Sequence, residues 1–241
     1  MEKLEKSYNL DIIRSEAFPY LNNEQDRNKI MLDNTTAHYV TIDKYFKTIL
    51  YIIEMHINIP NNLSVVDGFA GIGSDTIGFI VRKDDDLNYR YNKITSIEVN
   101  SHRYKMLTNN TNLYLNDIGR KLDNCINHLN INFLDFLDKP HKTDILYLDP
   151  PWGNLTDIVI NDIHIEDIID KIIDKKFVNN IIAIKLPKNY NFDKFKQKNI
   201  KFTVYEILKS DESVYLSIMI ILIKGKLGRI SGWNFRRIIN F

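Results

Sequence analysis

The stretch Ser64-Val-Val-Asp-Gly-Phe-Ala-Gly-Ile-Gly-Ser-Asp-Thr-Ile-Gly78 joins a short apolar run to a helical segment through closely spaced glycines. A buried strand that leads into a helix through such a turn is the start of a βαβ unit. Gly71 and Gly73 let the backbone turn tightly and approach a ligand at the carboxyl end of the strand. Open α/β sheets bind their ligands at this end, so the stretch predicts an α/β fold with a small-molecule site.

Strand and helix patterns alternate along the chain around this turn. The predicted strands cover 63–67, 93–99, 125–133, 144–148, 178–186, 202–208 and 214–223, and the predicted helices cover 74–82, 101–116, 165–176 and 192–198. This alternation predicts a Rossmann-like α/β fold with a seven-stranded, mainly parallel sheet and an antiparallel C-terminal hairpin. The order is that of class I methyltransferases, although the pattern alone leaves a flavodoxin-like or dinucleotide-binding domain open.

The chain divides into three predicted parts. Residues 1–58 form an N-terminal helical extension, with short helices over 3–14 and 24–31 and a longer helix from the N-cap Thr41 to about residue 56. Residues 59–224 form the core. Residues 225–241 form a basic and aromatic tail, which could hold RNA phosphates or lie in solvent.

The composition excludes several classes of protein. The 241 residues carry a net charge of +1, whereas proteins that coat nucleic-acid duplexes need a large positive surplus. The single cysteine, Cys125, excludes an internal disulfide and a cysteine-based zinc site. The six histidines share no ligand spacing, so no metal site is predicted. No apolar run is long enough to span a membrane and no signal peptide opens the chain, so we expect an intracellular protein. The richness in Ile, Asn and Lys is compatible with an AT-rich genome, such as that of a virus in a host cell.

Acidic residues follow three predicted strands, and they favour one cofactor. Asp67 lies in the glycine turn, where it would repel a phosphate and attract an ammonium group. This favours S-adenosylmethionine over a nicotinamide dinucleotide, as does the lack of the usual third glycine. Glu98 ends the second strand and could accept both ribose hydroxyls, and Asp135 follows the third strand and could accept from the adenine amino group. Each of these acids could instead be a solvated side chain at a strand end.

The motif Asp149-Pro-Pro-Trp-Gly153 follows the apolar strand over 144–148. The two prolines fix the backbone and remove two N–H groups, so that the preceding carbonyl and Asp149 can both accept from an exocyclic amine. Trp152 offers a flat face on which a nucleobase can stack. The alternative is a strand-end turn with Trp152 packed in the core. The motif favours methyl transfer to an amine, a reaction that needs mainly alignment of donor and acceptor.

The cofactor turn and the Asp-Pro-Pro-Trp motif together resemble S-adenosylmethionine-dependent amino-methyltransferases. Within that group the chain looks most like the trimethylguanosine synthases, which methylate the 2-amino group of 7-methylguanosine in RNA caps. Residues 29–43 are similar to the family's Lys-Leu-Asp and Val-Thr-Pro-Glu stretch, and residues 179–189 to its Asn-Asn-Ile and Leu-Pro-Arg-Asn loop. The resemblance covers residues 29–223.

The resemblance implies a role for each matching residue. Trp152 would stack on the methylated guanine, and Asp149 and Pro150 would hold its 2-amino group. The implied cofactor-binding residues are Asp67, Phe69, Ala70, Gly71, Gly73, Glu98, Asp135 and Thr41. Further candidate substrate-binding residues besides Trp152 are Lys185, Lys188 and Asn189. The two lysines lie at the end of the predicted fifth strand, where they could meet the triphosphate bridge or be ordinary solvated side chains. No metal is implied.

The chain departs from the family's pattern at three places. The family usually has serine at the position of Asp149, an aromatic pair at Ala37-His38 and Gly-Pro-Asp-Tyr near Asn154-Leu-Thr-Asp157.

The motifs and the resemblance together predict a monomeric, S-adenosylmethionine-dependent enzyme that acts on capped RNA or a cap dinucleotide. The alternatives are an adenine 6-amino or guanine 2-amino methyltransferase of DNA or ribosomal RNA, and a non-catalytic module that binds caps or RNA.

Overall fold

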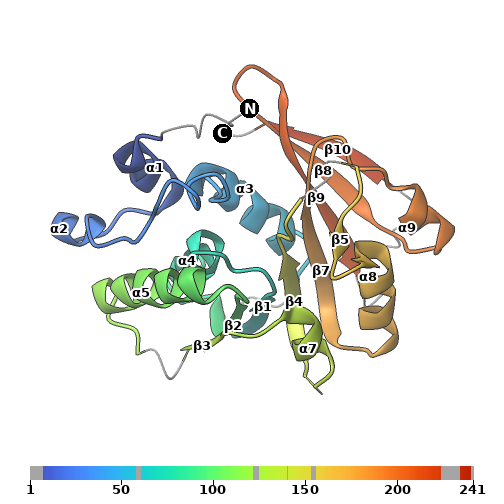
Figure 1. The fold of residues 1–241 in the computed structure, drawn as a ribbon, viewed down its shortest axis with the longest axis horizontal. Helices are drawn as coiled ribbons and strands as arrows, with labels where there is room; N and C mark the ends of the chain where they lie inside the picture. Colours follow the sequence, from blue (N-terminus) through green and yellow to red (C-terminus); the bar gives the residue numbers. More distant parts are fainter. Residues whose placement is uncertain are drawn as a thin grey trace.

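A mostly parallel, eight-stranded sheet runs through the molecule in the order β10-β8-β9-β7-β4-β1-β2-β3 (Figure 1). The computed structural model describes residues 8–57, 61–121, 125–139, 141–152, 156–223 and 234–239. The strands are β1 (Leu63–Asp67), β2 (Tyr91–Ile97), β3 (Ile126–Leu129), β4 (Thr143–Leu148), β7 (Val178–Leu186), β8 (Thr203–Leu208), β9 (Val214–Leu222) and β10 (Asn234–Ile239). β9 is antiparallel to both neighbours, β7 and β8, and the other pairs are parallel. The predicted fold class is confirmed.

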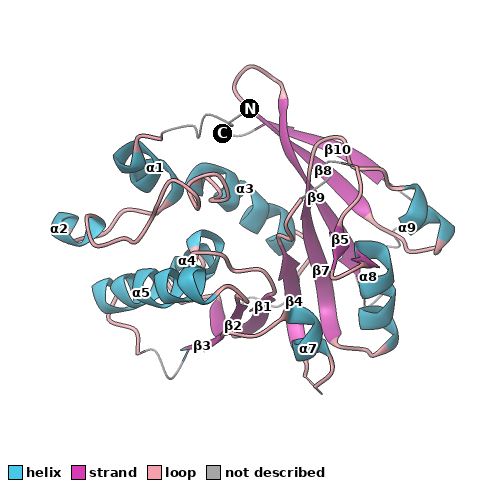
Figure 2. Cartoon of the chain, viewed as in Figure 1, coloured by secondary structure: helices cyan, strands magenta, loops and turns pink. Residues whose placement is uncertain are grey.

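Helices cover both faces of the sheet (Figure 2). One face carries α3 (Asp43–Glu54), α4 (Ser74–Val81) and α5 (Ser101–Asp117), and the other carries α7 (Phe133–Leu137), α8 (Ile165–Asp174) and α9 (Asp193–Gln197). The remaining elements are α1 (Leu10–Ala17), α2 (Glu24–Arg27) and a small hairpin of β5 (Val159–Ile160) and β6 (Ile163–His164). Within the described residues, no helix has the length and apolar character needed to cross a membrane.

The central strands are apolar along their whole length because both of their faces are covered. In β4, Ile145 and Tyr147 point into the core under α3 and α4, and Leu146 and Leu148 point into the core under α7 and α8. The same alternation continues through β7 and β9. The side chain of a strand residue can therefore be assigned to a layer from its parity alone.

The parallel strands bring the predicted site residues to one edge. Asp67 at the end of β1 is paired with Tyr147 in β4, and Leu148 is paired with Ile184 in β7. The residues that follow these strands therefore leave the sheet side by side, as expected of a doubly wound fold.

The N-terminal extension packs on α4 and α5 and reaches the glycine turn. Its buried Phe18 and Ile30 share a cluster with Ile72 of the turn and Tyr114 of α5. The fully buried Asn110 joins these parts through three hydrogen bonds. Its amide donates to the carbonyls of Met31 and Ile72, both at 3.0 Å, and its oxygen accepts from the Met31 N–H at 2.7 Å. The extension thus helps to fix the turn.

Several element boundaries differ from those predicted. The third strand ends at Leu129, because Asn132 caps α7 by accepting from the Leu134 N–H. Helix α3 begins after Ile42, so Thr41 is not its N-cap. In the predicted tail, Asn234–Ile239 forms β10, an eighth strand parallel to β8. Helix α1 begins at Leu10 and α2 ends at Arg27, and residues 3–7 of the first predicted helix lie outside the described residues.

Replacement of Asn110 should weaken the fold. Asn110→Ala removes the partner of three backbone groups, of which the Ile72 carbonyl is buried, so we expect the free energy of unfolding to fall by about 2–4 kcal/mol. Asn109→Ala is a matched control, because its half-buried amide donates to the Lys29 carbonyl at 2.9 Å as well as to Asn110 at 3.1 Å. We expect a loss of about 1 kcal/mol for the control. Urea titrations measure both values, and equal losses would contradict the role of Asn110.

Candidate active site

The glycine turn has the backbone shape that a close ligand requires. Gly71 has a φ of +55° with no atom within 4 Å of a Cβ placed there, and Gly73 has a φ of +95°. A Cβ on Gly73 would lie 2.9 Å from Cδ1 of Leu107, so a side chain there would also require Leu107 to move. The Gly68 and Ala70 N–H groups donate to the carbonyls of Tyr147 and Ile97, at 3.0 and 2.9 Å. The turn therefore rests on β4 and β2 and leaves open space at Gly71.

Asp67 is a fully buried carboxylate with an unused oxygen. Its Oδ2 accepts from the Thr76 hydroxyl at 2.6 Å, and its Oδ1 has no hydrogen-bond partner among the described residues. Burial raises the pKa of Asp67 to about 8, with further contributions from the nearby Asp75 and Asp149. An unsatisfied buried oxygen is costly, so this geometry fits a ligand that supplies a donor or a positive charge.

Glu98, predicted to bind the ribose, ties the turn to the end of β2. Its Oε2 accepts from the Gly71 N–H at 3.0 Å, and its Oε1 accepts from the Asn100 N–H at 2.8 Å. Arg103 Nε lies 3.4 Å from Oε1. Burial raises the pKa of Glu98 against these hydrogen bonds and the charge of Arg103. Each oxygen keeps a second lone pair that a ribose hydroxyl could use.

A buried ammonium holds the residue that follows β4. Lys185 shares the parity of Ile181 and Ala183, so its side chain points under α3 rather than into solvent. Its Nζ donates to Asp149 Oδ2 and, at 2.6 Å, to the Thr41 hydroxyl, and it lies 3.7 Å from Asp75 Oδ2. Burial opposes its charge, but Asp149 and Asp75 raise the pKa of Lys185 overall, so the ammonium stays protonated. The expectation that Lys185 meets a triphosphate from solvent is wrong, because its side chain is buried.

Trp152 is held by the backbone of the same lysine. Its indole Nε1 donates to the Lys185 carbonyl at 3.3 Å, and the Lys185 ammonium lies 5.9 Å from the ring centroid. The ring is half-buried and packs against the cores on both faces of the sheet. Lys185 thus positions Asp149 through its side chain and Trp152 through its main chain.

Asp75 and Tyr147 belong to the site and were not predicted. The Tyr147 hydroxyl donates to Asp75 Oδ2 at 2.6 Å, and both side chains are buried. Asp75 lies in the first turn of α4, directly after the glycine turn. The carboxylates of Asp75 and Asp149 therefore contact the single ammonium of Lys185, and buried Asp67 lies close enough to both carboxylates for their charges to raise its pKa. The excess of negative charge fits a cationic ligand. The sequence signal for Tyr147 is its position along β4, two residues after Ile145, which directs both side chains to the same face of the sheet.

The other predicted site residues lie in more open places. Asp135 is exposed on the first turn of α7, not at the end of a strand. Lys188 and Asn189 are exposed in the loop after β7. Phe69 is half-buried and packs on Phe133, with ring centroids 5.0 Å apart. Ala70 and Pro150 are buried. Gly153 and Asn154 lie outside the described residues.

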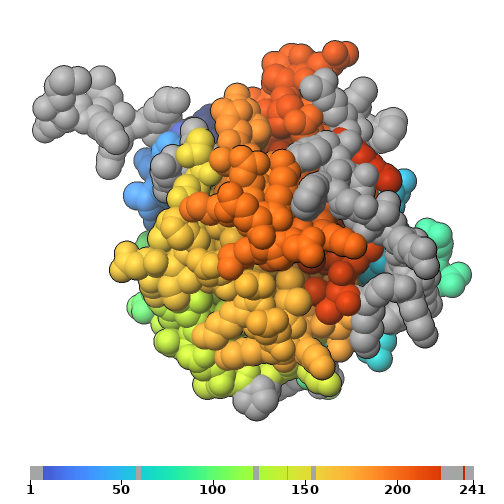
Figure 3. Space-filling view, turned by 90° about the vertical axis from the view of Figure 1, so that its right-hand side faces the viewer, coloured from blue at the N-terminus to red at the C-terminus, as the bar shows by residue number. Residues whose placement is uncertain are grey.

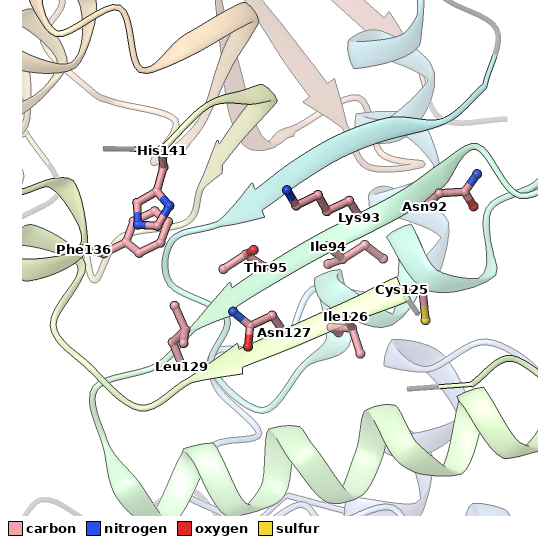
Figure 4. Close-up of a pocket in the computed structure, with 10 residues that line it drawn as sticks. All are labelled: Asn92, Lys93, Ile94, Thr95, Cys125, Ile126, Asn127, Leu129, Phe136 and His141. Atoms are coloured by element: carbon pink, nitrogen blue, oxygen red, sulfur yellow. The ribbon is translucent and has the colours of Figure 1, made fainter. Parts of the chain in front are cut away.

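A pocket of about 360 Å³ lies away from this edge, over β2 and β3 (Figure 4). Lys93 and Thr95 line it, beside the stacked rings of Phe136 and His141, whose centroids are 4.2 Å apart. Ile94 between them belongs to the core under α4, so the pocket is on the opposite face. It contains none of the motif residues and is separate from the candidate site.

Comparison with known proteins identifies a matching family model and a viral relative. Residues 63–223 match the family model of the RNA cap guanine-N2 methyltransferases. A viral relative, the uncharacterised protein L320 of Acanthamoeba polyphaga mimivirus, is 28% identical in an alignment of 227 residues that covers 83% of this chain and 82% of that protein.

Two solved structures share the fold at low sequence identity. A Listeria monocytogenes protein assigned as a class I S-adenosylmethionine-dependent methyltransferase is 13% identical, with a TM-score of 0.57 over 82% of this chain and 65% of that one. A Porphyromonas gingivalis protein assigned as a methyltransferase is 14% identical, with a TM-score of 0.58 over 82% of this chain and 47% of that one. The chain therefore spans less than two thirds of either structure.

The family model covers more than half of the chain and includes both motifs that line the sheet edge. The fold and the family imply S-adenosylmethionine as the cofactor, and the unpaired oxygen of Asp67 and the excess of buried carboxylates fit its positive charge. The protein is an S-adenosylmethionine-dependent methyltransferase, and the chain belongs to the RNA cap guanine-N2 methyltransferase family.

Proposed function

We propose that the protein transfers a methyl group to the exocyclic 2-amino group of a 7-methylguanosine RNA cap. The observation that carries this proposal is the arrangement of Asp149 and Trp152. Both follow β4, both are fixed by Lys185, and both lie at the sheet edge that carries the glycine turn. A hydrogen-bond acceptor beside a stacking ring is what recognition of an exocyclic amine on a base requires.

The glycine turn and its acids would hold the cofactor. When bound, S-adenosylmethionine supplies an electrophilic methyl group on a sulfonium. In our proposal the free Oδ1 of Asp67 accepts from the methionine ammonium, and Glu98 accepts from the ribose hydroxyls. Phe69, Ala70, Gly71 and Gly73 form the surface on which the cofactor lies, because Gly71 keeps that space open. Asp135 would accept from the adenine amino group. The net negative charge of the buried carboxylates attracts the sulfonium.

Trp152 and Asp149 would orient the base. A 7-methylguanine carries a positive charge and therefore stacks better on an electron-rich indole than a neutral base does. Asp149 Oδ2 is bound by Lys185, which leaves Oδ1 to accept from the 2-amino group. Lys188 and Asn189 are exposed after β7, so they are the candidates for phosphate contacts in place of Lys185.

Asp149 also suits the chemical step. Transfer forms a nitrogen–carbon bond, breaks the carbon–sulfur bond and leaves an extra proton on the amine. Acceptors aimed at the nitrogen stabilise the positive charge that develops there. Burial raises the pKa of Asp149 even though Lys185 lowers it, so this carboxylate is a better proton acceptor than an exposed aspartate. Lys185 keeps the carboxylate in place while the charge changes.

Mass spectrometry of methylated nucleosides tests the substrate. The protein and labelled S-adenosylmethionine are incubated separately with a 7-methylguanosine-capped RNA, the same RNA with an unmethylated cap, and uncapped RNA and DNA. We expect methyl transfer to the 2-amino group of the 7-methylated cap. Methylation of adenine or internal guanine, without methylation of that cap, would contradict the cap assignment and support a DNA or ribosomal RNA substrate. Cofactor binding without turnover on any substrate would support a non-catalytic binding module.

Trp152 variants test the stacking contact. Loss of one base–aromatic contact costs about 1–3 kcal/mol, so Trp152→Ala should lower kcat/KM on the capped substrate by roughly 5- to 150-fold. Trp152→Phe keeps an aromatic ring, so its kcat/KM should lie between those of Trp152→Ala and the natural protein. Cofactor affinity, measured by calorimetry, should stay the same in both. An unchanged kcat/KM in Trp152→Ala would place the base elsewhere.

We expect Asp67 to lower the stability of the cofactor-free protein as the pH rises and to support binding of the cofactor. Its pKa is raised to about 8 in the folded protein, against about 4 in an unfolded chain. Between these values the folded state holds the proton more tightly, so the contribution of Asp67 to stability is present below pH 4 and is lost as the pH rises to 8. The slope approaches about 1.4 kcal/mol per pH unit.

Asp67→Asn removes this titration. Urea unfolding of the cofactor-free protein at pH 5 and pH 8 should show a smaller loss of stability in the variant than in the natural protein. The same variant should bind S-adenosylmethionine more weakly in calorimetry at pH 7.5. Equal pH dependence would argue against the raised pKa, and equal affinity would remove Asp67 from the cofactor site.

A further inference from the structure

Three potential metal ligands meet beyond the substrate motif. Single ligand atoms of Asp157, His164 and Glu166 all lie within 4.8 Å of one another. The β5–β6 hairpin makes this possible, because it folds the chain back so that His164 pairs with Val159. His164 Nδ1 is 3.1 Å from Asp157 Oδ1, and Glu166 lies in the first turn of α8. The sequence spacing gave no sign of this cluster.

Glu166 provides the second observation. Its side chain is 1% exposed, and its carboxylate is part of the cluster. The Tyr190 hydroxyl donates to Oε1 at 2.6 Å, while Oε2 is buried with no hydrogen-bond partner among the described residues. A buried carboxylate oxygen without a partner is costly, and a cation within reach would remove that cost.

Lys194 of α9 lies at the rim of the cluster. Its Nζ is 3.2 and 3.3 Å from the two oxygens of Asp157 and 3.0 Å from His164 Nδ1. The side chain is 45% exposed, so it can turn out into solvent. No hydrogen bond joins it to Glu166 in the described structure. The ammonium therefore neutralises the outer part of the cluster and leaves the buried carboxylate oxygen without a partner.

We propose that Asp157, His164 and Glu166 bind one divalent transition-metal ion, with Lys194 displaced. An imidazole with two carboxylates suits zinc or manganese. The hydroxyl of Tyr190 would act as the outer-shell partner that orients a ligating carboxylate. This site is separate from methyl transfer, and no step of the proposed reaction passes through it.

The position of the site gives the ion a structural role. Asp157 is five residues beyond Trp152 in the sequence, and Glu166 lies in the first turn of α8. The gold and orange surfaces of α8 and α9 lie side by side in Figure 3, in agreement with the ion pairs of Lys198 with Asp167 and Asp170. An ion at the cluster would join the chain that follows the substrate motif to this helical layer.

Calorimetric titration of the metal-stripped, full-length protein with ZnCl2 and with MnCl2 tests the proposal. We expect one ion per chain. Glu166→Gln, which keeps the size of the side chain, should weaken binding by at least ~10-fold, and Tyr190→Phe by ~10-fold. Lys194→Met removes the competing ammonium and should strengthen binding.

Lys198→Met is the matched control, because Lys198 directly follows the helix that carries Lys194. Lys198 also bridges two carboxylates, at 2.9 Å to Asp167 and 3.2 Å to Asp170, but no histidine takes part in that group. Its removal should leave the affinity unchanged. Circular dichroism checks that each variant is folded, and if Glu166→Gln does not fold, Tyr190→Phe and Lys194→Met decide. Absence of binding in both the natural protein and Lys194→Met, or equal affinity in Tyr190→Phe, would overturn the proposal.

Discussion

The bonds of the Lys185 ammonium with Asp149 and Thr41 join three parts of the molecule that are distant in sequence. Thr41 belongs to the N-terminal extension, Asp149 follows β4, and Lys185 ends β7. The carbonyl of the same lysine also binds the Trp152 indole. A buried charge is costly unless it is paired, so these parts have only one arrangement in which the ammonium is satisfied. The shape of the substrate end of the site therefore depends on a single side chain.

The charged groups around this ammonium are those expected of a site that binds a cationic ligand. The carboxylates of Asp75 and Asp149 outnumber the one ammonium between them, and burial together with these two charges raises the pKa of Asp67. A protein selected for stability alone would replace such groups with apolar ones. The retained carboxylates make sense when a sulfonium cofactor binds beside them. For the same reason, the buried carboxylates proposed to attract the cofactor lower the stability of the folded protein when no cofactor is bound.

The sequence predicted the sheet well because the central strands are buried on both faces. β1 and β7 have the predicted bounds, since each is rich in β-branched apolar residues and is followed by turn residues. The β5–β6 hairpin was missed because its strands have two residues each. Its signal was the pair Asn161-Asp162, which adopts φ values of +49° and +63° as a tight hairpin turn requires. Thr41 was read as a helix cap because its hydroxyl partner, Lys185, is 144 residues away. Lys185 was expected to contact the triphosphate bridge or solvent, whereas strand parity assigns its side chain to the core.

Strand β10 affects whether the sheet can add strands from other molecules at its edge. The hairpin β8–β9 is strongly apolar, and an uncovered β8 would offer a row of free main-chain donors and acceptors to other chains. β10 pairs with all six residues of β8, and its exposed Arg236 lies in the middle of the strand. Charged residues at a sheet edge discourage strand addition. By pairing with β8, the last strand therefore covers the main-chain groups through which this edge of the sheet could add a strand from another molecule.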